Sequence, residues 1–169
     1  AEGTSNIGLG SESLASLTTG TNNSALGYRA LYSNTTGSFN TANGWYSLSQ
    51  NTGNYNSAFG SQALSSNTTG SHNTALGLGS LLFNTTGSSN IAVGGNALRL
   101  NTTGATNTAT GFAALKNNTT GSSNVAAGAY ALQSSVSANY NVAVGFSALG
   151  SNTTGAQNTA SGYQALYSN

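Results

Sequence analysis

Residues 84–100 read NTTGSSNIAVGGNALRL, and the same pattern, N-T-T-G-S-x-N-T-A-x-G-x-x-A-L-x-x, returns along the whole chain. Its second asparagine recurs every 17 residues, with a single spacing of 16 between Asn40 and Asn56. A fixed short period indicates one supersecondary unit that is repeated and stacked. Because each repeat is short and holds two glycines, it cannot supply a pair of helices. The period therefore favours stacked coils made of strands and turns.

The best candidate strand in each repeat follows the second asparagine, as in residues 90–94 and 141–145. These segments alternate with a period of two, which places Asn, Ala and Gly on one face and Ile or Val on the other. The alanine position holds only small residues, as expected where opposite walls of a narrow coil approach closely. The sequence predicts an all-β fold: one parallel β-solenoid domain over residues 1–169, with about ten coils.

One position of the repeat is always leucine, and these leucines are the predicted core. Each should contact its equivalents in the coils above and below, and burial of one leucine contributes roughly 1.5–3 kcal/mol. The core leucines are Leu14, Leu31, Leu48, Leu64, Leu81, Leu98, Leu115, Leu132, Leu149 and Leu166.

Glycine and asparagine define the corners of each coil. The glycine that ends the strand, such as Gly94, is expected to need positive φ or a close backbone approach. The T-T-G segment forms the other corner, so the missing residue of the short repeat should be absorbed at Asn51-Thr52-Gly53. Stacked asparagines are expected to form hydrogen-bonded amide ladders.

Composition argues against chemistry at a localised site. The chain has three Lys or Arg, two carboxylates (Glu2 and Glu12), one histidine (His72) and no cysteine. A net charge near zero implies neither nucleic acid nor membrane as a partner, and no apolar run is long enough for membrane insertion. A lone histidine without Asp or Cys cannot build a metal site or a Ser-His-Asp triad. We therefore expect no enzyme activity and no cofactor.

The pieces Asn90-Ile91-Ala92-Val93-Gly94 and Asn141-Val142-Ala143-Val144-Gly145, each followed by residues like x-x-A-L, resemble the head repeats of YadA-type trimeric autotransporter adhesins. The fuller string that begins at Asn40 is similar to repeats of bacterial surface and phage tail-fibre-like proteins. The resemblance implies a left-handed β-roll, an extracellular or cell-surface location and an adhesive or structural role. It also implies a homotrimer packed through the apolar outer face, and it brings no catalytic residue.

Several surface features suggest further hypotheses. Adjacent threonines recur once per coil and raise the possibility of ice binding, although neighbours in an extended segment face opposite ways. Aromatic residues in neighbouring coils, such as Phe39 beside Tyr55, suggest lateral contacts or a platform for glycans of a host surface. The N-x-S/T pattern marks six acceptors for N-glycosylation, for which a purely local turn role is the alternative. These are Asn34, Asn67, Asn84, Asn101, Asn118 and Asn152.

Both ends of the sequence lie within the repeat. Residue Asn169 followed by residues 1–6 of a second copy would read as a further repeat, so we expect head-to-tail stacking into a filament. The residues assigned to this contact are Ala1, Gly3, Asn6, Leu166 and Asn169. The leading hypothesis is an extracellular structural protein that forms a fibre or stalk. The alternatives are a segment of a longer chain, a trimeric adhesin or tail fibre, and an ice-binding protein.

Overall fold

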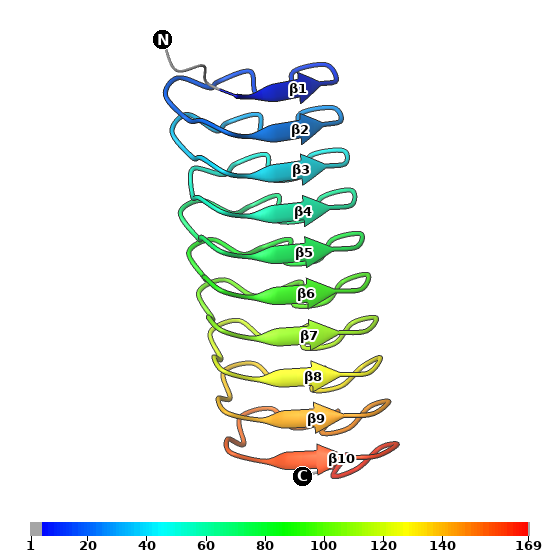
Figure 1. Ribbon diagram of the computed structural model, residues 1–169. Coiled ribbons are helices and arrows are strands. Elements are labelled where there is room, and N and C mark those ends of the chain that lie inside the picture. Colours follow the sequence, from blue (N-terminus) through cyan, green and yellow to red (C-terminus); the bar gives the residue numbers. More distant parts are fainter. Residues whose placement is uncertain (1–4, 169) are drawn as a thin grey trace.

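The computed structural model describes residues 5–168, which form a single β-solenoid (Figure 1). All ten strands have three residues, and they pair in parallel in one sheet in the order of the sequence. The predicted fold class is confirmed. The strands are β1 (Ile7–Leu9), β2 (Ser24–Leu26), β3 (Thr41–Asn43), β4 (Ser57–Phe59), β5 (Thr74–Leu76), β6 (Ile91–Val93), β7 (Thr108–Thr110), β8 (Val125–Ala127), β9 (Val142–Val144) and β10 (Thr159–Ser161).

The register of the sheet follows the sequence repeat. Ala75 pairs with Ala92 one coil further on. Across the short repeat Ala42 still pairs with Ala58, so the deletion does not change the strand register. The change is absorbed at the T-T-G corner, as predicted. There the Asn51 side chain donates to the carbonyl of Gly53, two residues on, whereas Asn34 donates to Gly37, three residues on.

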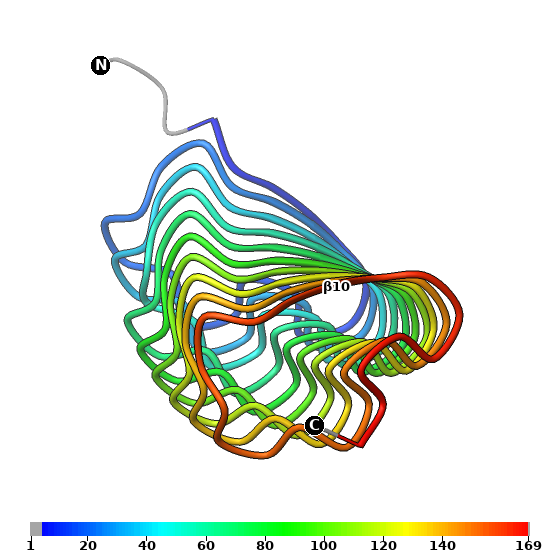
Figure 2. The ribbon, with the colours of Figure 1, turned by 90° about the horizontal axis from the view of Figure 1, so that it is seen from below.

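The coil winds with a left hand, as the resemblance implies. In Figure 1 the strands lie on the near side and run from left to right, while the chain descends by one coil per turn. Figure 2, seen from the C-terminal end, shows β10 at the top and the chain turning clockwise from it. In both views the chain leaves each strand on the same side and returns behind the sheet.

Alanine and leucine columns fill the interior of the rod. The middle residue of a strand, such as Ala92, is fully buried, while its two neighbours face outward. Eight of the ten predicted core leucines, from Leu31 to Leu149, have no exposed surface. Leu14 is partly buried, and Leu166 in the last coil is 51% exposed. The leucine column is therefore a core between coils, and the terminal leucines are covered on one side only.

The two glycine columns serve different purposes. The strand-ending glycine has positive φ throughout, for example +128° at Gly94, a region that residues with a side chain rarely adopt. The T-T-G glycine is needed for space instead. A Cβ atom on Gly104 would lie 2.5 Å from Oδ1 of Asn101 in the same corner.

Candidate functional site

The described part of the chain, residues 5–168, holds no enclosed site. No pocket is present there, and no three His, Cys, Asp or Glu side chains lie together as a metal would require. The same residues include no helix long and apolar enough to cross a membrane. The most regular features of the described residues are columns of equivalent side chains that run along the rod.

The second asparagine of the repeat forms a continuous hydrogen-bonded ladder inside the rod. Asn90 donates from Nδ2 to Oδ1 of Asn73 at 3.2 Å and to the carbonyl of Gly104 at 2.8 Å. Its own Oδ1 accepts from the backbone N and from Nδ2 of Asn107. Each amide thus joins three coils, which confirms the predicted ladder. One such bond contributes about 0.5–1.5 kcal/mol net, and more is lost if a buried partner is orphaned.

The first asparagine of the repeat forms a second internal column, which supports the local turn role and argues against glycans at these positions. Nδ2 of Asn84 donates to Oδ1 of Asn67 at 2.7 Å and to the carbonyl of Gly87 at 2.8 Å. A glycan on Nδ2 would replace these bonds inside a closed coil, so the folded rod cannot carry it. All six predicted acceptors are 98–100% buried: Asn34, Asn67, Asn84, Asn101, Asn118 and Asn152.

The threonine pairs do not form a two-column array. The first hydroxyl of a pair bonds to the next coil, as Thr85 Oγ1 donates to the carbonyl of Thr102 at 3.0 Å. The second threonine, such as Thr86, is exposed. Only one hydroxyl column therefore faces outward; the short corner at residues 51–53 interrupts it, and Ser137 replaces one of its threonines. This geometry gives little support to ice binding.

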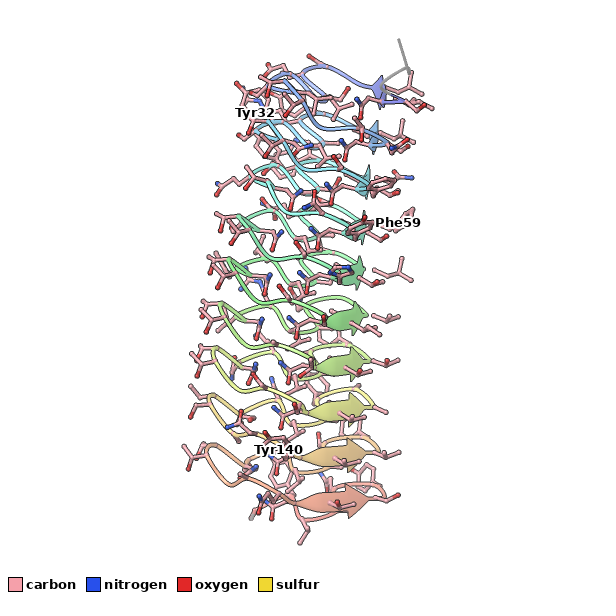
Figure 3. The ribbon with its side chains drawn as sticks, turned by 60° about the vertical axis from the view of Figure 1, so that its left-hand side comes forward. Tyr32, Phe59 and Tyr140 are labelled. Atoms are coloured by element: carbon pink, nitrogen blue, oxygen red, sulfur yellow. The ribbon has the colours of Figure 1, made fainter. Side chains whose placement is uncertain are left out.

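Exposed large apolar side chains occur at two kinds of position: on the outer face of the strands, and two residues after the last residue of a strand. Every coil contributes at least one, and the set accounts for fourteen of the twenty-one exposed large apolar side chains of the described residues. Figure 3 shows Phe59 pointing away from the sheet at this face. The outer strip, as it is called below, consists of Ile7, Leu9, Leu26, Tyr28, Trp45, Phe59, Leu76, Leu78, Ile91, Phe112, Val125, Val144, Phe146 and Tyr163.

A charged and aromatic cluster links the first three coils. Arg29 donates from Nε to the carboxylate of Glu12 at 2.7 Å and from Nη1 to the hydroxyl of Tyr46 at 2.7 Å. These hydrogen bonds, first that to Glu12, raise the pKa of Arg29 above its ordinary value. The guanidinium also lies 5.0 Å from the ring centre of Tyr32 and 5.2 Å from that of Tyr28. Since Arg29 is already surrounded by partners, the cluster is a link between coils.

Three rings stack along one corner of the rod. Phe39 and Tyr55 lie 5.0 Å apart with an angle of 6° between their planes, which confirms the predicted pair. His72 continues the stack at 5.0 Å from Tyr55. Both faces of the Tyr55 ring are thus covered by its neighbours, so this ring offers only its edge to a sugar.

The residues assigned to end-to-end contact are only partly described. Ala1, Gly3 and Asn169 lie outside the described residues. Asn6 is half-buried and donates to the carbonyl of Gly20 at 2.9 Å, so it begins the inner ladder. The exposed Leu166 would be covered by any coil that continues the rod.

No protein-family model, curated protein or solved structure matches the chain. The resemblance to adhesin head repeats consequently stays an expectation from the sequence. On the surface of the rod, the outer strip gathers more exposed apolar side chains than the rest of the described residues together.

Proposed function

We propose that this chain is a section of an extracellular structural rod, of the kind that builds a fibre or stalk. Its role is to provide length and stiffness and to associate with copies of itself, and not to catalyse a reaction. The observation that carries the proposal is the outer strip, which contributes apolar side chains in every coil of an otherwise polar rod.

The outer strip supports lateral association because exposed apolar side chains recur in every coil along one side of the rod. Contiguous patches above a few hundred Å² usually mark an interaction site. The strip follows one outer face of the sheet through all ten strands of the described residues, so it is matched in length by the same face of a second rod. The net charge is only +1, so copies repel one another little.

Two modes of self-association are compatible with the rod. Head-to-tail stacking would add coils at the ends and would cover Leu166, whose interior equivalents are fully buried. Side-by-side packing, as in a trimeric adhesin or tail fibre, would cover the outer strip instead. The strip favours the lateral mode, while the leucine column supports continuation of the rod along its axis by coils of the same or another chain.

The test is the solution mass of the protein, measured by light scattering over a range of concentrations, together with electron micrographs. We expect discrete oligomers of fixed mass. The double change Phe112→Ser and Phe146→Ser removes two rings from the strip and should shift the population to monomers. Truncation of an aromatic hot spot near the centre of an interface costs about 2 kcal/mol or more in association.

The matched control is Phe39→Ser, because Phe39 is 49% exposed and Phe112 is 51% exposed, but Phe39 lies outside the strip. This variant should keep the wild-type mass. Fibres that lengthen with concentration in the double variant would favour head-to-tail stacking over lateral packing. A chain that stays monomeric at all concentrations would refute the proposed self-association.

A further inference from the structure

Between Asn34 and Asn152 the first asparagine column is interrupted at one coil. From Asn67 to Asn118, Nδ2 of each asparagine donates to Oδ1 of the asparagine one coil before it, the last such bond being Asn118 to Asn101 at 2.8 Å. The next position is Ser135, whose side chain does not reach Oδ1 of Asn118. Both Oδ1 of Asn118 and Oγ of Ser135 are buried without a hydrogen-bond partner.

A second substitution accompanies the first in this coil. Where the column has asparagine, a glycine follows three positions later, or two positions later in the short corner of Asn51, but three positions after Ser135 the residue is Ala138, which is 2% exposed. In an intact coil a Cβ atom on Gly104 would lie 2.5 Å from Oδ1 of Asn101. A Cβ atom there would also meet the carbonyl of Gly121 in the next coil. Serine removes only the contact with Oδ1, and in this respect the alanine depends on the serine.

The replacement of asparagine and glycine by Ser135 and Ala138 leaves space for about one heavy atom. Asparagine with glycine supplies four side-chain heavy atoms, and serine with alanine supplies three. The amide that is lost would have donated two hydrogens. In the intact coil these reach Oδ1 of the preceding asparagine and the carbonyl of the T-T-G glycine, as Asn101 does with Asn84 and Gly104.

The carbonyl of Ala138 has lost one donor. The corresponding carbonyl of Gly104 accepts from two asparagine side chains, Asn90 and Asn101. That of Ala138 accepts from Asn124 alone among side chains, at 2.7 Å. The interrupted coil therefore groups two acceptors that need hydrogens, Asn118 Oδ1 and the Ala138 carbonyl, with one hydroxyl that can donate.

We propose that the interrupted coil holds one internal water molecule in place of the missing amide. The water donates to Oδ1 of Asn118 and to the carbonyl of Ala138, and it accepts from the hydroxyl of Ser135. Buried waters typically make about three hydrogen bonds to polar groups that would otherwise be unsatisfied. The ladder is thus continued through a solvent molecule instead of a side chain.

A crystal structure at a resolution that orders internal water tests the proposal. We expect a density peak within hydrogen-bond distance of Asn118 Oδ1, Ser135 Oγ and the Ala138 carbonyl. In the double variant Ser135→Asn with Ala138→Gly the peak should vanish, because the introduced amide occupies its place. This variant should unfold at a higher temperature than wild type, whereas Ser135→Asn alone should unfold at a lower one, because its side chain meets the Ala138 methyl group.

The matched control introduces the same serine and alanine pair into another coil. The changes Asn101→Ser and Gly104→Ala should create a second peak against Oδ1 of Asn84. A wild-type map in which Ser135 bonds directly to Asn118 with no density between them would overturn the proposal. So would a double variant that is no more stable than Ser135→Asn alone, because the lost amide would then not explain the site.

Discussion

Asn90→Asp is expected to destabilise the rod by about 3–5 kcal/mol at neutral pH, the range for an uncompensated buried charge. The side chain is fully buried and its Nδ2 makes two donated bonds, to Asn73 Oδ1 and to the Gly104 carbonyl. A carboxylate would turn both contacts into pairs of facing acceptors. It would keep only the bonds accepted from Asn107.

The loss should depend on pH. When the introduced carboxyl is protonated, its O–H can donate to one of the two acceptors, so burial and the facing oxygens raise its folded-state pKa above the unfolded value of about 3.9. The folded state then binds more protons than the unfolded state, and stability falls as pH rises through this window. The free energy of unfolding of the variant should be highest below about pH 4, near the unfolded-state pKa of the carboxyl. It should fall as the pH rises and level off above the raised folded-state pKa of the same group.

Urea unfolding at several pH values provides the measurement, and the background is small because the chain contains only two carboxylates of its own. Asn43→Asp is the control, since Asn43 is exposed on the outer face of β3 and should change stability by less than about 0.5 kcal/mol. Equal effects of the two changes, or a pH-independent loss for Asn90→Asp, would contradict the role assigned to the ladder.

The period of the sequence was enough to predict the solenoid, the buried Ala and Leu columns and the glycine at the end of each strand. These features follow from residue size and spacing alone. The inner ladder of second asparagines was also predictable, because Asn recurs on the same face as the buried Ala. In each case one residue type fills the position in nearly every coil.

The position of the first asparagine was not predicted. In T-T-G corners the sequence suggests an exposed turn, and an exposed turn leaves Asn84 open to a glycan as well as to local hydrogen bonding. The signal against an exposed turn is the glycine three residues later, since Gly87 has no positive φ and an added Cβ atom there would meet Oδ1 of Asn84 as well as the carbonyl of Gly104 in the next coil. The pair Ser135 and Ala138 shows the converse, because the residue three positions later is larger where the first residue is smaller than asparagine.

The backbone conformation of the core leucines also could not be predicted from the sequence. Leu98 has a φ of 50°, in the left-handed region that leucine seldom adopts. A single-residue preference would predict the opposite. The neighbouring coils impose this geometry, because the Leu98 N–H donates to the Ala114 carbonyl at 3.0 Å while the side chain stays buried.

Gly94→Ala is expected to destabilise the rod by about 3 kcal/mol or more, through backbone strain added to a steric clash. Gly94 has a φ of +128°, and a Cβ atom there would lie 2.6 Å from the carbonyl oxygen of Gly111 in the next coil. That oxygen is backbone and belongs to the stacked column, so it cannot move without shifting the coils beyond it.

The adjacent change Gly95→Ala separates this cause from a general need for glycine. Gly95 has no positive φ, and an added Cβ atom would lie 3.4 Å from the nearest atom of Phe112, a flexible side chain. The equivalent residue two coils later is Ala129, so we expect stability within about 1 kcal/mol of wild type, with a gain if the unfolded chain is stiffened. Thermal unfolding of the two variants measures the difference. Equal losses at both positions would mean that the close approach of successive coils is not what requires Gly94, whereas a loss at Gly94 alone assigns the requirement to the stacking of coils.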